Sequence, residues 1–264
     1  MFANRRLSSE LSRLLGDGLA FAAVPEPAGR ALGAALSAPS RCGEPLSGLA
    51  LGPAFSDVEI KRTLDNCRLD YVYEPDWHRL FQRTSKLLSQ GKVVAWFQGS
   101  MGFGPRALGT RSILCDPSSR YARHNINEYP RQTALDEPLP VVFAPSVATQ
   151  CLMRPLTSRL GVMDGAVAAE WRDRLAATLD WRHFVRVHAL HPDQASELCQ
   201  LLECHYQRSQ VPALIETNLC GPGEPLACTP RDAVRTVYSS AIDVLVIGRF
   251  VLMKDHWLLR SDVG

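Results

Sequence analysis

Two arginines, Arg106 and Arg111, lie in a glycine-rich segment whose composition suits the binding of an anion. A guanidinium group offers paired N–H donors to phosphate or carboxylate oxygens. The glycines of this segment lack a Cβ, so the backbone can turn at positive φ and approach a ligand closely. They are Gly99, Gly102, Gly104 and Gly109. Their spacing matches neither a dinucleotide fingerprint nor a P-loop, so a glycine-rich hairpin with solvated arginines is an equally good interpretation.

Two strands are expected to hold this loop. The apolar run 93–97 follows Gly91 and predicts a buried strand, and a second strand is expected from Ser112 to Cys115. Asp76 can cap a helix that ends at Gly91 and delivers the chain to the first of these strands. Further upstream, residues 56–59 read as a capping box that opens another helix.

A second basic position, Arg186, falls in a segment with the period-two pattern of a strand, residues 183–190. Arg186 and His188 then point to the same side, and an arginine that shares a face with a histidine can bind an anion. Arg131 follows Pro130 in a polar stretch, where a solvated loop cation is the plain interpretation. The segment 151–180 shows helix-like apolar spacing, and its Asp164 and Asp180 are interpreted as surface caps.

The remaining segments alternate between expected helices and expected strands. Further elements are expected as a helix over 193–209, a strand over 211–215, a helix begun by the cap of residues 229–232, and a closing pair of strands over 244–253. Because strands and helices mix without strict βαβ alternation, we expect an α/β fold with a twisted, mostly mixed sheet and flanking helices. A small helical or irregular N-terminal segment precedes it, with helices expected over 7–15 and 31–36.

Residues 96–114 read WFQGSMGFGPRALGTRSIL. This phrase resembles the hallmark WFQGRMEFGPRALGNRSIL of the carbamoyltransferase family that includes nodulation-factor and antibiotic-tailoring O-carbamoyltransferases (the NodU/CmcH type). Ser100, Gly102 and Thr110 depart from it. The segment 217–230, TNLCGPGEPLACTP, is similar to the family's NTSFNVRGEPIVCTP. There Asn218 takes the place of a ligand-contacting serine, and Glu216 and Cys220 replace asparagines.

The resemblance implies a YrdC-like domain that activates carbamoyl phosphate with ATP and Mg²⁺, giving carbamoyl adenylate and pyrophosphate. Both substrates are anionic, so the expected catalytic role is electrostatic and needs no covalent nucleophile. Arg131 sits at the spacing of the family's substrate-binding lysine, and Arg186 matches a family arginine. The expected catalytic residues are Arg106, Arg131 and Arg186. The residues expected to bind ATP or carbamoyl phosphate are Gly104, Arg106, Arg111, Ser112, Arg131, Arg186 and Asn218.

The resemblance also implies a division of the chain. The phrases FANRRLSSEL and PEPAGRALGAAL resemble the end of the family's N-terminal transfer domain, so residues 1–52 are expected to be a remnant of that domain plus a linker, and residues 53–264 the activating domain. That domain binds iron, but Pro27 stands at the place of its metal-binding aspartate and its histidines would precede Met1. No iron or other metal ligand is therefore expected in this chain.

Complete transfer to a hydroxyl group of a small molecule, such as a secondary metabolite or sugar, would then need a partner subunit or domain. Antibiotic biosynthesis is the expected context. The alternative is a catalytically incomplete nucleotide-binding module or fragment. The departures at Ser100, Gly102, Asn218 and Cys220 favour this alternative, whereas the intact GPRALG and RSIL phrases and the spaced arginines favour the enzyme.

Composition limits the remaining classes. With 264 residues, 46% hydrophobic and 21% charged, the chain can bury one sizeable core. A net charge of +2 gives no reason to expect a nucleic-acid partner, and no run of about 20 apolar residues predicts a membrane span. Without a signal-peptide pattern, a cytoplasmic location is expected. The eight cysteines form no CxxC pair and are expected to be reduced core thiols.

Overall fold

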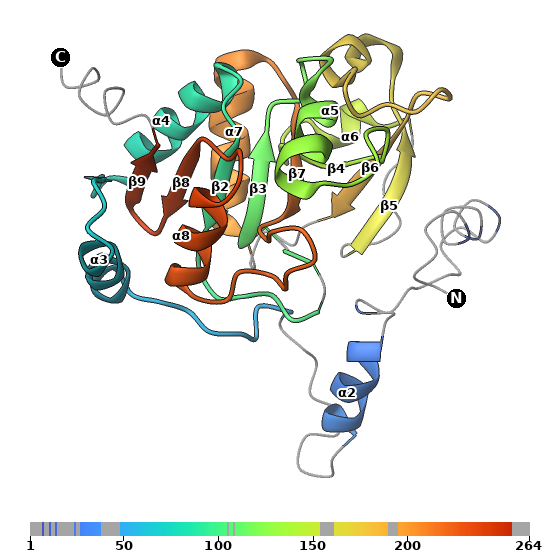
Figure 1. Cartoon of the computed structure of the whole chain (residues 1–264). Helices are drawn as coiled ribbons and strands as arrows, with labels where there is room; N and C mark the ends of the chain where they lie inside the picture. The colour runs from blue at the N-terminus through green and yellow to red at the C-terminus, as the bar shows by residue number, and fades with distance from the viewer. Residues whose placement is uncertain are drawn as a thin grey trace.

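The computed structural model describes residues 7, 11, 14, 24, 27–37, 48–104, 106–107, 109–153, 161–189 and 195–254. Within these residues one nine-stranded sheet forms the centre of the molecule, in the order β1-β9-β8-β2-β3-β7-β4-β6-β5 (Figure 1). The strands are β1 Val72–Tyr73, β2 Val94–Phe97, β3 Arg111–Cys115, β4 Pro140–Phe143, β5 Gly161–Ala166, β6 Phe184–Ala189, β7 Ala213–Asn218, β8 Val244–Ile247 and β9 Phe250–Met253.

The sheet is mixed, as the sequence predicts. Strands β2 and β8 pair in parallel, as do β4 and β6, while the other neighbouring pairs are antiparallel. Every residue of β2, β3, β8 and β9 is buried, which is the pattern of strands covered on both faces. The predicted α/β class is therefore confirmed, and the strands expected over 93–97, 112–115 and 244–253 are found.

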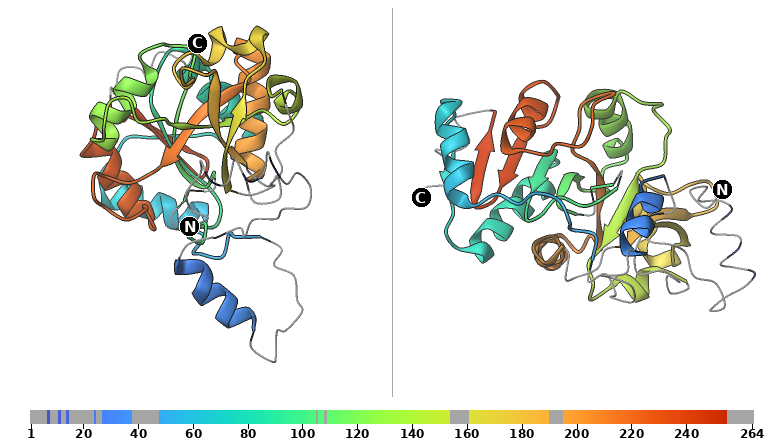
Figure 2. Two further views of the ribbon diagram at one scale, coloured as in Figure 1. Left: turned by 90° about the vertical axis from the view of Figure 1, so that its right-hand side faces the viewer. Right: turned by 90° about the horizontal axis from the view of Figure 1, so that it is seen from below.

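Helices lie on both faces of this sheet, and one further helix, α2, lies apart from it (Figure 1). They are α2 Pro27–Leu36, α3 Asp57–Asn66, α4 Trp77–Ser89, α5 Ala122–Ile126, α6 Ala148–Cys151, α7 Ser196–Ser209 and α8 Pro230–Tyr238, with short η turns Asn127–Arg131 (η2), Ala169–Trp171 (η3) and Asp173–Leu175 (η4). Helices α4 and α7 pack against each other on one face, and α8 lies on the opposite face (Figure 2).

The predicted helix starts hold. Ser56 and Glu59 form the capping box of α3, Asp76 caps α4, and Thr229 and Asp232 form a second capping box at α8. Each cap satisfies backbone N–H groups that the first helical turn leaves without partners. These local signals fix where three of the helices begin.

The segment just before residue 53 is attached to the glycine-rich loop between β2 and β3. Gly52 N–H donates to Met101 O at 2.8 Å, and Phe103 N–H donates to Leu49 O at 2.6 Å. A Cβ on Gly52 would lie 2.8 Å from Met101 O, so only glycine permits this approach. Leu49 and Val24 form a small buried cluster with residues of α2, which lies away from the sheet in Figure 1. Most of the helix predicted over 7–15, and linker residues 41–47, lie outside the described residues.

The helix-like interpretation of residues 151–180 is wrong in its central part. Gly161–Ala166 form β5, an edge strand that pairs antiparallel with β6. Pairing with a strand already set in the sheet overrides the weak local preference of a segment containing Gly161, Asp164 and Gly165. Asp164 consequently faces Arg186 across the two strands and is not a helix cap. Asp180 does cap a turn, because its Oδ1 accepts N–H groups from residues 182 and 184.

Two broader expectations can be compared with the described residues. No helix among them is long and apolar enough to cross a bilayer. Seven of the cysteines are described and all seven are free thiols, as predicted. Burial raises the pKa of the Cys115 and Cys151 thiols to about 12, which makes both chemically inert near neutral pH.

Candidate functional site

Three of the predicted arginines line one cavity. Arg106 comes from the glycine-rich loop, Arg131 from η2 and Arg186 from β6, and Asn218 at the end of β7 lies beside them. The cavity has a volume of about 150 Å³, well below the roughly 300–1,000 Å³ of a typical small-molecule pocket. As it is lined by the described residues, the cavity therefore suits an anionic group of phosphate or carboxylate size. We call it the arginine pocket; its full lining is Arg106, Arg131, Glu137, Pro138, Pro140, Arg186, His188, Glu216, Thr217 and Asn218.

Arg131 is positioned by a local break in helical geometry. Pro130 has no N–H to donate, and residues 127–131 form a π-helical turn instead of continuing α5. Buried Asn127 fixes the end of this turn, because its Oδ1 accepts from Arg131 Nη1 at 2.8 Å and its Nδ2 donates to Glu137 O at 2.8 Å. Arg131 Nη2 also lies 3.5 Å from Glu137 Oε1. The guanidinium is thus held at the pocket rim by both hydrogen bonding and charge.

Arg186 is positioned by its strand and by backbone contacts. Its Nη1 donates to Pro138 O at 2.6 Å, and its Nε lies 4.0 Å from Asp164 Oδ1 on the adjacent strand. Burial lowers the pKa of Arg186 below its ordinary value, opposed by the Asp164 carboxylate and reinforced by the charges of Arg106 and Arg131. Arg106 and Arg131 therefore both lie near enough to Arg186 to repel its charge, which favours occupancy of the pocket by an anion.

Arg106 is connected to the sheet through its neighbour. Ala107 N–H donates to Asn218 Oδ1 at 2.9 Å, and Thr110 N–H donates to Ala107 O at 3.0 Å. The loop turns at Gly99, Gly104 and Gly109, all at positive φ as the sequence predicts. Asn218 therefore fastens the loop that carries Arg106 to the end of β7.

Arg111 occupies a different environment from the other arginines. Its side chain is fully buried, donates to the carbonyls of Pro53, Gln98, Gly99 and Thr110, and lies 3.6 Å above the Phe97 ring centroid. Burial lowers the pKa of the Arg111 guanidinium to about 10, so it stays charged at neutral pH. These contacts make Arg111 a support of the loop, and it does not line the arginine pocket.

The remaining predicted ligand-binding residues also lie outside the pocket lining. A Cβ on Gly104 would lie 3.5 Å from Val24 Cγ1, so this glycine faces the N-terminal segment. Ser112 is fully buried on β3, where its hydroxyl donates to Glu216 Oε1 at 2.5 Å. Ser112 thus does not line the pocket itself but contacts Glu216, which does.

Two acidic residues of the pocket, Glu137 and Glu216, were not predicted. Glu216 is buried between Ser112 and His188, whose Nδ1 lies 2.5 Å from Glu216 Oε2. A carboxylate at the end of the apolar run 211–215 was the available signal, because a charged residue in a buried strand needs partners. His188 was expected to share a face with Arg186, and both line the pocket.

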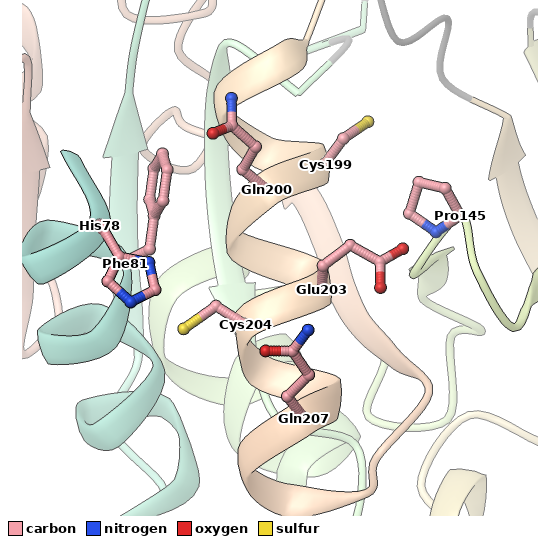
Figure 3. A pocket seen from close by; sticks show the side chains of 8 residues that line it. All are labelled: His78, Phe81, Pro145, Cys199, Gln200, Glu203, Cys204 and Gln207. Carbon is pink, nitrogen blue, oxygen red and sulfur yellow. The ribbon is translucent and has the colours of Figure 1, made fainter.

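A second cavity lies between α4 and α7 (Figure 3). His78 and Phe81 contribute from α4, and Cys199, Glu203 and Cys204 from α7. Glu203 is occupied as a cap, since Ser146 donates to it through both N–H and Oγ–H, at 2.7 and 2.6 Å. This cavity is lined by the exposed polar side chains of His78, Gln200 and Gln207 but by no arginine or lysine of the described residues, so it is less suited to an anion than the arginine pocket.

The sequence assigns the chain to a family. Residues 85–254 match the Carbamoyltransferase C-terminus family, and the chain belongs to this family. A Synechocystis protein of uncharacterised function, sll1178, is 32% identical over 86% of this chain and 42% of its own length. The nodulation protein NolO of Bradyrhizobium diazoefficiens is 26% identical over 86% of this chain and 43% of its own. A 3'-hydroxymethylcephem-O-carbamoyltransferase of Streptomyces clavuligerus is 49% identical over 16% of the chain.

The chain spans about two fifths of the length of the first two of these relatives. Among solved structures, full-length HypF in a phosphate- and nucleotide-bound form aligns with a TM-score of 0.48 and 16% identity, covering 65% of this chain and 25% of that one. The Escherichia coli protein YciO aligns with a TM-score of 0.47 and 14% identity, covering 67% and 81%. At these scores, the family assignment rests on sequence alone.

Proposed function

We propose that the arginine pocket binds the anionic groups of carbamoyl phosphate and ATP, and that the chain activates the carbamoyl group as carbamoyl adenylate. One observation carries the proposal: Arg106, Arg131 and Arg186, from three separate segments, line a single small cavity. Membership of the Carbamoyltransferase C-terminus family supplies the substrate class. Carbamoyl phosphate, the nucleotide and the departing pyrophosphate are all anions, so one cationic pocket serves each of them.

The proposed reaction has two steps. Carbamoyl phosphate is hydrolysed to carbamate and phosphate. A carbamate oxygen then attacks the α-phosphorus of ATP, a new P–O bond forms, and the bond from the α-phosphorus to the bridging oxygen breaks to release pyrophosphate. The guanidiniums contribute by neutralising charge on the phosphoryl oxygens and by holding the attacking and leaving oxygens in line.

Magnesium fits this scheme as a companion of the nucleotide. No cluster of three or more His, Cys, Asp or Glu side chains able to hold a metal ion occurs among the described residues. Of the two pocket carboxylates, Glu137 is paired with Arg131, and Glu216 is enclosed by Ser112 and His188. Nucleotide-bound Mg²⁺ takes most of its ligands from phosphate oxygens and water, so the residues present suit an ion that neutralises phosphate charge.

Transfer of the activated carbamoyl group to a small-molecule hydroxyl completes the proposed role. The relatives are more than twice as long as the region they share with this chain. We propose that the acceptor site and the iron-dependent transfer step belong to a further domain or a partner subunit.

Pyrophosphate release from ATP tests the activating step. The purified chain with Mg²⁺ is expected to release pyrophosphate only when carbamoyl phosphate and ATP are both present. Arg106→Ala should lower the rate by about 100-fold or more, the usual effect of removing one group that stabilises transition-state charge. Arg182→Ala is the matched control, because Arg182 is half-exposed, pairs with Asp180 and does not line the pocket.

Other outcomes would redirect the assignment. Absence of pyrophosphate, combined with a higher unfolding temperature in ATP, would indicate a nucleotide-binding module without turnover. If ATP has neither effect, the activating function is wrong for this chain.

A further inference from the structure

A chain of three buried side chains ends in the arginine pocket. Ser112 on β3 donates to Glu216 on β7, and Glu216 accepts in turn from His188 on β6, with both oxygen contacts at 2.5 Å. The side chains of His188 and Glu216 are each 2% exposed. Strands β3 and β7 are neighbours, whereas β4 lies between β6 and β7, so the contact of His188 with Glu216 links two strands that are not neighbours in the sheet.

The contacts determine which nitrogen of His188 is left without a hydrogen-bond partner. Burial alone would raise the pKa of Glu216, but the charge and hydrogen bond of His188, and hydrogen bonds from Ser112 and Gly109, hold that pKa below its ordinary value. Glu216 is therefore an ionised acceptor, and His188 Nδ1 must carry the proton between them. Nε2 is left as the variable nitrogen. It is buried, has no hydrogen-bond partner in the described structure, and belongs to a residue that lines the pocket.

We propose that His188 is a fourth anion ligand of the arginine pocket, which donates Nε2–H as an imidazolium, so that anion binding is coupled to the uptake of one proton. The proposal deepens the proposed function, because it concerns the same pocket. In this proposal, protonated His188 is the group that makes the pocket bind an oxyanion in preference to water. A buried nitrogen without a hydrogen-bond partner is costly, and because His188 lines a polar cavity, an oxyanion bound there can supply the missing acceptor.

The surrounding charges explain why the proton arrives with the anion. Arg106, Arg131 and Arg186 oppose a further positive charge in the empty pocket, while Glu137 and Glu216 favour it. A bound dianion offsets the arginine charges and leaves the two carboxylates to stabilise the imidazolium. An unprotonated Nε2 would instead turn its lone pair toward an oxyanion, which is repulsive. Protonation and anion binding therefore strengthen each other, as linkage requires.

Inorganic sulfate is the probe, because it remains a dianion between pH 6 and 8 and any proton taken up belongs to the protein. Isothermal titration calorimetry in two buffers of different ionisation enthalpy measures that uptake. The wild-type chain is expected to take up protons when it binds sulfate at pH 8, and its affinity should fall as the pH rises, by at most about tenfold per pH unit. His188→Gln should bind sulfate without proton uptake and with little pH dependence. His124→Gln, an exposed histidine outside the pocket, should behave as wild type.

A wild-type chain that binds sulfate without proton uptake, or that does not bind it, would overturn the proposal. So would a His188→Gln variant that keeps the wild-type pH dependence. If His188→Gln does not fold, ¹⁵N NMR of wild-type His188 decides the question, since Nε2 must become protonated when sulfate is added at pH 8. Proton-linked sulfate binding without pyrophosphate release would leave this inference standing and reject the activating function. Pyrophosphate release without proton-linked binding would do the reverse.

Discussion

Asp164 and Arg186 are cross-strand partners on β5 and β6, and Arg186 Nε lies 4.0 Å from Asp164 Oδ1. Both side chains are largely buried, at 23% and 18% exposure, so the carboxylate moderates the positive charge at the wall of the arginine pocket. Asp164 therefore sets how strongly Arg186 attracts an anion.

Replacing Asp164 by Asn should strengthen anion binding. The change removes a negative charge from a partly buried pair while keeping the size of the side chain, so sulfate is expected to bind about two- to fivefold more tightly. Calorimetric titration measures the affinity. Asp65→Asn removes the acid of an exposed pair with Lys61 on α3 and should leave sulfate binding unchanged. Equal or weaker binding by Asp164→Asn would show that Asp164 acts by positioning Arg186 and not by its charge.

Replacing Arg111 by Ala should destabilise the fold more than it alters binding chemistry. The change removes one donor from each of four loop carbonyls, of which Pro53 O and Thr110 O keep a backbone N–H donor, and leaves a cavity over Phe97. This is expected to cost roughly 3–5 kcal/mol. Urea unfolding at neutral pH measures the loss. The matched control is Arg235→Ala, an exposed arginine paired with Glu224, which should change stability by less than about 1 kcal/mol. A loss as small as that of the control would contradict the supporting role of Arg111.

The free energy of unfolding should fall in acid because the Asp116 carboxylate becomes protonated. Burial would raise the pKa of Asp116, but hydrogen bonds from His205 and Ser118 hold it below the ordinary value of 3.8. A carboxyl group with a depressed folded-state pKa contributes stability that is complete above its unfolded pKa and is lost as pH falls through the folded pKa. Asp116→Asn should therefore lower the free energy of unfolding by about 1–3 kcal/mol at pH 7.

The same comparison at low pH checks the sign. The difference in unfolding free energy between wild type and Asp116→Asn should narrow as the pH drops below 3.8, because the unfolded chain binds a proton at this carboxyl group there, while the folded chain does so only at its lower pKa. Chemical denaturation at pH 7, 4 and 3 provides the series. A difference that stays constant with pH would mean that the contribution of Asp116 is steric.

Asn218 offers a test that separates loop attachment from pocket charge. Asn218→Asp keeps the oxygen that accepts from Ala107 N–H but places a carboxylate at the pocket wall. We expect the unfolding temperature to stay close to wild type, while sulfate affinity falls at least about tenfold. Asn218→Ser is the neutral control and should lose less affinity than Asn218→Asp. A variant with unchanged affinity would place the bound anion away from β7.

Most local elements and the family could be predicted from the residues alone. The capping residues Ser56, Asp76 and Thr229 marked helix starts correctly, because a cap acts on backbone groups within one turn. The period-two pattern around Arg186 and His188 correctly placed both on one face. The glycine-rich phrase identified the family because its residue order is recognisable without any structure.

Which charged groups share a site became clear from the three-dimensional structure. Arg106 and Arg111 look alike in sequence, yet Arg106 lines the pocket and Arg111 does not. Arg111 is the first residue of β3, and its buried side chain lies over Phe97 and is enclosed by loop carbonyls. Glu216 contacts His188 across an intervening strand, β4. Strand β5 forms because its residues pair with β6. Burial and electrostatic coupling depend on distances in space, which the spacing of residues along a chain does not contain.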